Sequence, residues 1–145
     1  MEELLTRGET APPTRALLIA LDLGEYDLET ALGELSELAR TAGAEVCGTL
    51  TQKRDSPDVA TFLGSGRLAE AALYVQNLQI ELAIFERELS GSQIANIEKV
   101  LDCRVIDRTM LILDIFAQRA RSAEGRLQVE LAQQKYMLPR LTGRG

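Results

Sequence analysis

The stretch Ala16-Leu17-Leu18-Ile19-Ala20-Leu21-Asp22-Leu23 decides the fold class of this 145-residue chain. A short, continuous apolar run of this kind is typical of a β-strand that is buried on both faces of a parallel sheet. Similar runs follow at 44–51, 82–85 and 103–107, and segments with helical periodicity separate them. Alternating strands and helices give repeated βαβ units. The sequence therefore predicts an α/β domain with a four-stranded parallel sheet and flanking helices, for which we expect the strand order 2-1-3-4.

Three helices are expected between these strands, each with a start or stop signal. Asp27 is a suitable N-cap for the first helix, and Gly43 is a suitable residue to end it. The second helix is expected at about 67–79, and either Ser90 or Ser92 caps the third helix.

The last third of the chain is predicted to form one long helix from Thr109 to Leu138. Its apolar residues form one stripe at helical spacing: Leu113, Phe116, Ala120, Leu127, Leu131 and Leu138. About 30 residues give a helix of ~45 Å, whereas strands span only about 17–20 Å. Part of the stripe must therefore project beyond the sheet and needs a partner helix. Gly125 marks a candidate bend.

Charge is divided unevenly along the chain. From Arg104 to the C-terminus, 8 Lys and Arg stand against 4 Asp and Glu, a net charge of +4, whereas residues 1–103 carry −10. An acidic body with a basic helical arm favours an anionic partner for the arm. A solvated basic face beside a packing stripe is the alternative interpretation.

The composition excludes several kinds of site. The chain has no His, which removes the commonest general base and the commonest metal ligand. Aromatic residues make up only 4%, fewer than proteins that stack single-stranded bases generally use. Cys47 and Cys103 are the only cysteines, and we expect them to be buried, reduced thiols with no metal role. Because no signal sequence and no apolar run of about 20 residues occurs, we expect a cytoplasmic protein without a membrane span.

Six blocks of sequence follow one another in order between residues 16 and 141. They are Thr61-Phe62-Leu63-Gly64-Ser65-Gly66-Arg67, Phe85-Glu86-Arg87-Glu88-Leu89-Ser90-Gly91-Ser92-Gln93, Arg104-Val105-Ile106-Asp107-Arg108-Thr109, Leu113-Asp114-Ile115-Phe116-Ala117-Gln118-Arg119-Ala120, Leu127-Gln128-Val129-Glu130-Leu131-Ala132-Gln133 and Leu138-Pro139-Arg140-Leu141. Together they resemble the N-terminal domain of the HflX family of ribosome-associated GTPases.

The resemblance implies a translational GTPase that binds the large ribosomal subunit and its rRNA, and that splits or rescues stalled ribosomes. In that family an α/β subdomain is followed by a helical hairpin, whose tip reaches into rRNA, and then by a GTPase domain. The chain would thus comprise a flexible leader at 1–14, the α/β subdomain at 15–108 and the first half of the hairpin at 109–145. No G-x-x-x-x-G-K-[ST] motif occurs in it. We therefore expect no GTP hydrolysis by this chain alone, and GTP and Mg²⁺ are implied only for a GTPase domain.

Gly64, Ser65, Gly66 and Arg67 form a candidate phosphate-binding loop ahead of a helix. The glycines permit close backbone approach, free N–H groups at a helix start attract anions, and Arg67 would add a bidentate contact. The resembled family usually has Lys at this position and is reported to bind ATP outside its GTPase domain. A small nucleotide-binding sensor domain thus remains an alternative function, and a glycine turn beside a surface Arg is the alternative structure.

Five basic residues of the predicted helix are the candidate RNA-binding set: Arg119, Arg121, Arg126, Lys135 and Arg140. Arg140, near the presumed hairpin tip, is the strongest single candidate for a phosphate contact, because its planar guanidinium stays charged. The apolar stripe leaves a third possibility open, a module that dimerises through that stripe.

Asp107-Arg108-Thr109 lies at the junction between the last strand and the basic helix. Asp107 or Thr109 is expected to cap the helix, and Arg108 is expected to pair with Asp107 or another acid. Glu86 and Glu88 follow the third strand, at the sheet edge where α/β proteins bind ligands. Two carboxylates there could hold Mg²⁺ or act in acid–base chemistry, but without a nearby His or nucleophile we expect them to lie in a solvated loop.

Overall fold

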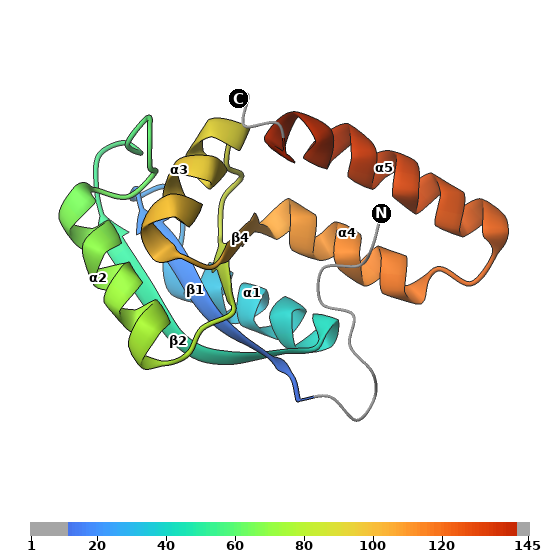
Figure 1. Ribbon diagram of the computed structural model, residues 1–145, viewed down its shortest axis with the longest axis horizontal. Coiled ribbons are helices and arrows are strands. Elements are labelled where there is room, and N and C mark those ends of the chain that lie inside the picture. The colour runs from blue at the N-terminus through green and yellow to red at the C-terminus, as the bar shows by residue number, and fades with distance from the viewer. Residues whose placement is uncertain (1–11, 142–145) are drawn as a thin grey trace.

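The computed structural model describes residues 12–141, which form a parallel sheet with flanking helices (Figure 1). The sheet order is β2-β1-β3-β4, so the predicted fold class and strand order are confirmed. The strands are β1 (Thr14–Asp22), β2 (Ala44–Lys53), β3 (Leu82–Phe85) and β4 (Arg104–Asp107). The helices are α1 (Leu28–Ala42), α2 (Ser65–Asn77), α3 (Gly91–Leu101), α4 (Arg108–Arg119) and α5 (Ala123–Leu141).

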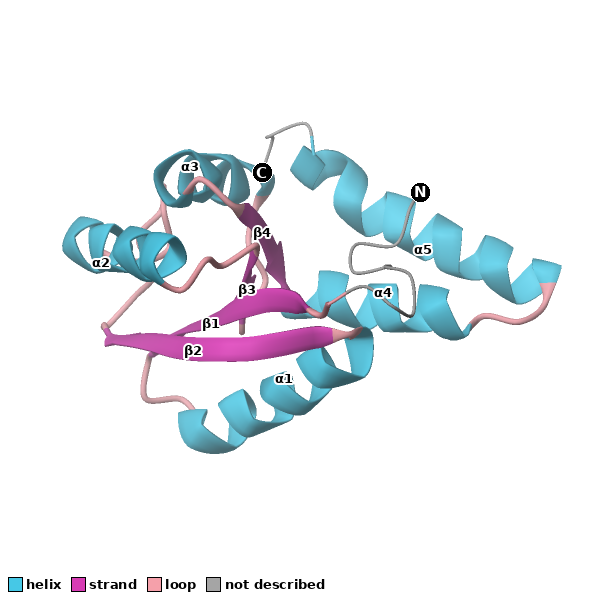
Figure 2. Cartoon of the chain, turned by 60° about the horizontal axis from the view of Figure 1, so that its bottom comes forward, coloured by secondary structure: helices cyan, strands magenta, loops and turns pink. Residues whose placement is uncertain are grey.

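The central strand β1 carries the core. Residues 16–21 are all buried, because β2 and β3 flank the strand and helices cover both faces of the sheet. The strand β2 is added on one side of β1, whereas β3 and β4 are added on the other side. Right-handed crossovers in these two opposite directions place α1 on one face of the sheet and α2 with α3 on the other face. Figure 2 shows this division, with α4 leading away from the sheet at the end of β4. The opening apolar run is therefore buried on both faces, as its composition predicts.

The predicted helix signals of α1 and α3 are present. The Asp27 carboxylate accepts a hydrogen bond from the backbone N–H of Glu29, and Gly43 ends α1 in the left-handed conformation with φ 102°. Ser90, rather than Ser92, caps α3 through a capping box with Gln93, in which each side chain accepts from the other residue's backbone N–H.

The predicted continuous helix from Thr109 to Leu138 is wrong, because the chain leaves the helical conformation at Ala120. Ser122 then starts α5: its Oγ accepts a hydrogen bond of 2.9 Å from the backbone N–H of Gly125. A serine that satisfies a free N–H stabilises a new helix start. Helix α5 runs back along α4 and reaches α3, so the two helices form an α4–α5 hairpin within this chain (Figure 1).

The apolar stripe predicted for this region is split between two helices and stays largely exposed. Phe116, Leu127, Leu131 and Leu138 each have more than half of their surface exposed. Of the expected leader, residues 1–11 lie outside the described residues, and β1 begins at Thr14. Among residues 12–141, every helix is too short or too polar to cross a lipid bilayer.

Candidate nucleic-acid interface

The tip of the α4–α5 hairpin, residues 120–122, is flanked by three exposed arginines. Arg119 ends α4, Arg121 lies in the turn, and Arg126 lies in the first turn of α5. Within the described part of the chain, none of the three forms an ion pair or a side-chain hydrogen bond. Three guanidinium groups within eight residues are therefore available to an anionic partner.

Lys135 is also exposed, but it lies in the second half of α5, away from the tip. Two acidic residues of the same helix, Glu124 and Glu130, are exposed as well. Glu124 lies in the first turn of α5, beside the tip arginines, so the tip carries three exposed arginines and one exposed carboxylate.

Arg140 does not lie near the tip, where it was expected. It lies at the base of the hairpin, the end at which α4 begins and α5 finishes. The cause is the reversal of the chain at 120–122, which returns the end of α5 to the α/β body (Figure 1). Its Nε donates to the carbonyl of Leu89 at 3.0 Å, and its Nη1 donates to the carbonyl of Tyr136 at 2.7 Å. Its side chain is only 20% exposed. The phosphate contact expected for Arg140 stays a prediction, and it competes with these internal contacts.

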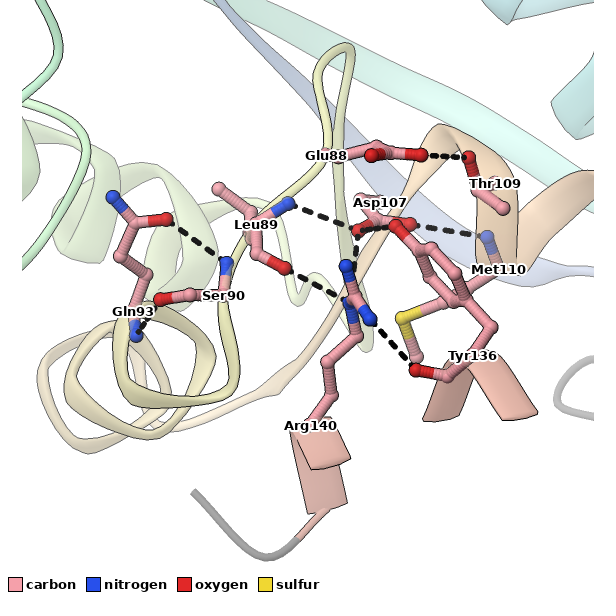
Figure 3. A network of polar contacts seen from close by, with 9 residues as sticks. All are labelled: Glu88, Leu89, Ser90, Gln93, Asp107, Thr109, Met110, Tyr136 and Arg140. Carbon is pink, nitrogen blue, oxygen red and sulfur yellow. Dashed lines mark hydrogen bonds and ion pairs between the residues drawn. The ribbon is translucent and has the colours of Figure 1, made fainter. Parts of the chain in front are cut away.

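Asp107 is the centre of the hairpin base (Figure 3). It is fully buried at the end of β4, and its Oδ1 accepts from the backbone N–H of Met110 at 3.0 Å, so Asp107 caps α4. Its Oδ2 accepts from the Leu89 N–H at 3.0 Å and from the Tyr136 hydroxyl at 2.6 Å. The Arg140 Nε lies 3.9 Å from the same oxygen. One carboxylate therefore joins the loop before α3, the start of α4 and the end of α5.

The Tyr136 side chain lies between the two charged groups of this network. Burial, together with the hydrogen bond to the Asp107 carboxylate, raises the pKa of Tyr136 well above its usual value. The Arg140 guanidinium carbon lies 3.6 Å from the centre of the Tyr136 ring, which is a close cation–π contact. Tyr136 thus stays a neutral hydrogen-bond donor at physiological pH.

Backbone contact completes the hairpin base. A Cβ atom at Gly91, the first residue of α3, would lie 2.7 Å from the carbonyl oxygen of Pro139 and 2.8 Å from the Cα of Arg140. Only glycine permits this close approach of two helices. The base is therefore shaped by both a polar network and direct backbone packing.

Of the other two residues of the Asp107-Arg108-Thr109 junction, Arg108 takes the role expected of it, whereas Thr109 does not cap the helix. Arg108 pairs with another acid, Glu34, at 3.5 Å. The Thr109 hydroxyl donates to the Glu88 carboxylate at 3.1 Å.

Glu86 is not in a solvated loop, as was expected, because it is 6% exposed. The Tyr26 hydroxyl lies 2.6 and 2.8 Å from its two carboxylate oxygens. Burial, and then this hydrogen bond, raise the pKa of Tyr26 to about 12. The buried carboxylate thus keeps a neutral donor as its partner. Among the described residues, no group of three or more Asp, Glu or Cys side chains is arranged to hold a metal ion.

The candidate phosphate loop is the first turn of α2 rather than a free loop. Gly64 is the N-cap and has no side chain to cap the helix, while Ser65, Gly66 and Arg67 are already helical. The Arg67 guanidinium donates to the Thr51 carbonyl at 2.8 Å and pairs with Glu70 at 2.6 Å. The structure therefore brings the four predicted residues together, although Arg67 has partners within the chain.

The structural roles of two hairpin residues, Ser122 and Tyr136, were not predicted from the sequence. Ser122 has a readable signal, because a serine three residues before the Gly125 N–H that it satisfies is a common helix start. Tyr136 has no such local signal in the sequence, because its partner Asp107 is 29 residues away and only the fold brings the two together.

Comparisons with known proteins follow this division of the chain. A family model described as GTP-binding GTPase N-terminal matches residues 29–117, and a second, GTP-binding GTPase Middle Region, matches residues 119–145. The boundary between the two matches adjoins the hairpin tip.

Individual relatives give the same result. GTPase HflX of Caldanaerobacter subterraneus subsp. tengcongensis is 54% identical over 145 residues, which are 100% of this chain and 32% of that protein. GTPase HflX of Escherichia coli (strain K12) is 46% identical over 117 residues, 81% of this chain and 27% of that protein. A solved GTP-binding protein from Sulfolobus solfataricus in complex with GDP has a TM-score of 0.65 at 28% identity, covering 89% of this chain and 38% of its own. The chain thus spans about a third of the length of the curated relatives it matches.

Proposed function

This chain belongs to the HflX family of GTPases, as its N-terminal region, and we propose that it binds the large ribosomal subunit through rRNA. The tip of the α4–α5 hairpin is the contacting element in this proposal. In the complete protein, the module would direct a GTPase to ribosomes that have to be split or rescued. This role would place the chain in the cytoplasm.

The observation that carries the proposal is the set of unpaired cations at the tip. Arg119, Arg121 and Arg126 are exposed and form no ion pair among residues 12–141, whereas most other arginines of the described chain are paired. An exposed arginine that forms no internal pair is free to neutralise a phosphate. Each phosphate neutralised releases counterions, which supplies most of the sequence-independent affinity for nucleic acid.

The binding experiment is co-sedimentation of the chain with isolated large ribosomal subunits across a series of salt concentrations. Small subunits serve as the specificity control. We expect log affinity to fall linearly with log salt, and replacement of Arg119, Arg121 and Arg126 together by Gln to flatten the slope by about two to three units. A folded triple variant with an unchanged slope would remove the tip from the interface. Equal binding to both subunits would contradict a specific role on the large one.

GTP chemistry is not proposed for these residues. No P-loop motif occurs in the sequence, so we expect isothermal titration with GTP and Mg²⁺ to detect no binding to this chain. A micromolar dissociation constant would contradict that expectation.

A nucleotide site at the start of α2 is a second candidate. No side chain caps this helix and its first turn contains no acid, so its free N–H groups can donate hydrogen bonds to an anion. ATP titration of the native chain and of Arg67→Gln tests it. Micromolar binding that weakens in the variant supports the site, and no binding to either protein rejects it.

Self-association through the exposed apolar stripe of the hairpin is a third candidate function. Phe116, Leu127, Leu131 and Leu138 present apolar surface that a second copy of the hairpin would cover. Sedimentation velocity across a concentration series decides this question. A monomer at every concentration would reject dimerisation.

A further inference from the structure

The inner face of α5 offers little apolar contact with the body. Of its described residues, only Gln133 and Met137 are buried, and the Gln133 Oε1 has no hydrogen-bond partner. Helix α1, in contrast, buries four apolar residues, among them Leu35 and Ala39. Apolar packing is non-directional, and here it is also sparse, so it does not define how α5 lies on the body.

Directional contacts gather instead at one end of α5. The Tyr136 hydroxyl and the Arg140 guanidinium both meet the buried Asp107 carboxylate, and Arg140 also binds the Leu89 carbonyl (Figure 3). Asp107 in turn caps α4, the other helix of the hairpin. The same carboxylate thus holds both helices of the hairpin, and hydrogen bonds to a fixed acceptor restrict angle as well as distance.

We propose that Asp107, Tyr136 and Arg140 are positioning residues, which fix the direction of the α4–α5 hairpin relative to the α/β body. By fixing the hairpin, the network presents the tip arginines to RNA in one orientation. This consequence for RNA binding rests on the proposed function. Arg140 then serves the interface from the hairpin base, through its internal contacts rather than through a phosphate.

The proposal separates two ways of weakening RNA binding. Loss of a tip arginine removes a phosphate contact, so both the affinity and its salt dependence fall. Loss of a base residue leaves every tip cation in place, but the hairpin no longer has one fixed direction. Ordering it on binding then costs free energy. Affinity then falls while the salt slope stays the same.

Distances between spin labels measure the direction of the hairpin without any RNA. Labels are attached through Gln128→Cys on α5 and Ala69→Cys on α2, both exposed positions, in a chain with Cys47→Ser and Cys103→Ser. Figure 1 shows α2 and the hairpin tip at opposite ends of the molecule. We expect one narrow distance distribution for the parent chain, and a broader or shifted distribution for Tyr136→Phe and for Arg140→Gln. Arg126→Gln is the matched control and should leave the distribution unchanged.

Binding of Tyr136→Phe to large ribosomal subunits provides the second measurement. We expect affinity to fall roughly threefold to tenfold, the effect of restoring order on binding, with an unchanged salt slope. Unchanged distances in both base variants, with native circular dichroism, would overturn the positioning role. Altered distances in a chain that binds no ribosomal subunit would uphold it and reject the proposed function instead.

Discussion

The two ends of the α4–α5 hairpin use the same residue type in opposite ways. At the tip, Arg119 and Arg126 are exposed and form no ion pair within the described chain. At the base, Arg140 contacts two backbone carbonyls, the ring of Tyr136 and the Asp107 carboxylate. The difference shows that a basic residue in a basic helix is not by itself a binding residue. Its partners within the fold decide whether it is available to another molecule.

The largest effect is expected from Asp107→Ala, which removes the acceptor at the hairpin base. The N–H groups of Leu89 and Met110, the Tyr136 hydroxyl and the Arg140 guanidinium would all lose a buried partner. Breaking such a buried network lowers the free energy of unfolding by about 3–5 kcal/mol. Urea denaturation measures this loss.

Asp27→Ala is the matched control for that change, because it removes an aspartate that caps α1 at an exposed position. The control should lose less stability than Asp107→Ala. Equal losses would show that Asp107 acts as an N-cap and nothing more.

The second effect in size is expected from Gly91→Ala at the contact between α3 and α5. The new Cβ would meet backbone atoms of Pro139 and Arg140 at under 3.0 Å. Displacing packed backbone lowers the free energy of unfolding by about 1–3 kcal/mol. Gly66→Ala, where the Cβ meets nothing within 4 Å, should raise stability by up to about 1 kcal/mol in the same helical setting. Equal effects in the two variants would contradict the close contact.

Tyr136→Phe should produce a smaller loss, because it removes one hydroxyl and leaves the ring in place. We expect the free energy of unfolding to fall by about 1 kcal/mol at pH 8. The pKa of Tyr136 is raised in the folded chain, so the neutral hydroxyl stabilises the fold below its ordinary pKa near 10, and this contribution is lost as pH rises above that value. Urea titrations at pH 8 and pH 10.5 test this. The parent chain should lose more stability between them than the Phe variant, and parallel losses would contradict the assignment.

The tip should show the smallest effect on stability. Replacing Arg119, Arg121 and Arg126 by Gln removes no ion pair within residues 12–141, so the free energy of unfolding should change by less than about 0.5 kcal/mol. The melting curve of the triple variant checks this. A large loss would mean that the tip arginines support the fold, as Arg140 does.

Local sequence patterns were sufficient to predict the α/β body. The run at 16–23 and the caps Asp27 and Gly43 depend on neighbouring residues, so the strands and helices of the body could be read directly. The expected strand order agrees with the structure, but no local pattern determines it. Asp107, one of the two residues expected to cap the following helix, is the one that caps it. These predictions succeeded because burial on both faces and helix capping each have a short-range signature.

The hairpin could not be predicted in the same way. Apolar spacing alone favoured one helix from 109 to 138, and the cap at Ser122 outweighs that spacing locally. The position of Arg140 follows from the reversal of the chain, and its partners Leu89 and Asp107 are distant in sequence. Glu86 was likewise misassigned to solvent because its partner, Tyr26, is 60 residues away. Long-range polar pairs have no periodicity, so residues such as Arg140 and Glu86 were expected at the surface although the fold gives them internal partners.

Single variants at the two ends of the hairpin, Arg126→Gln and Arg140→Gln, separate a binding tip from a positioning base. Each removes one positive charge, and the affinity of each for large ribosomal subunits is measured across the same salt series. We predict that Arg126→Gln flattens the log–log slope by about 0.7–0.9, the value for one phosphate contact. Arg140→Gln should weaken binding with no change of slope. A flattened slope for Arg140→Gln and an unchanged slope for Arg126→Gln would contradict the division into a binding tip and a positioning base.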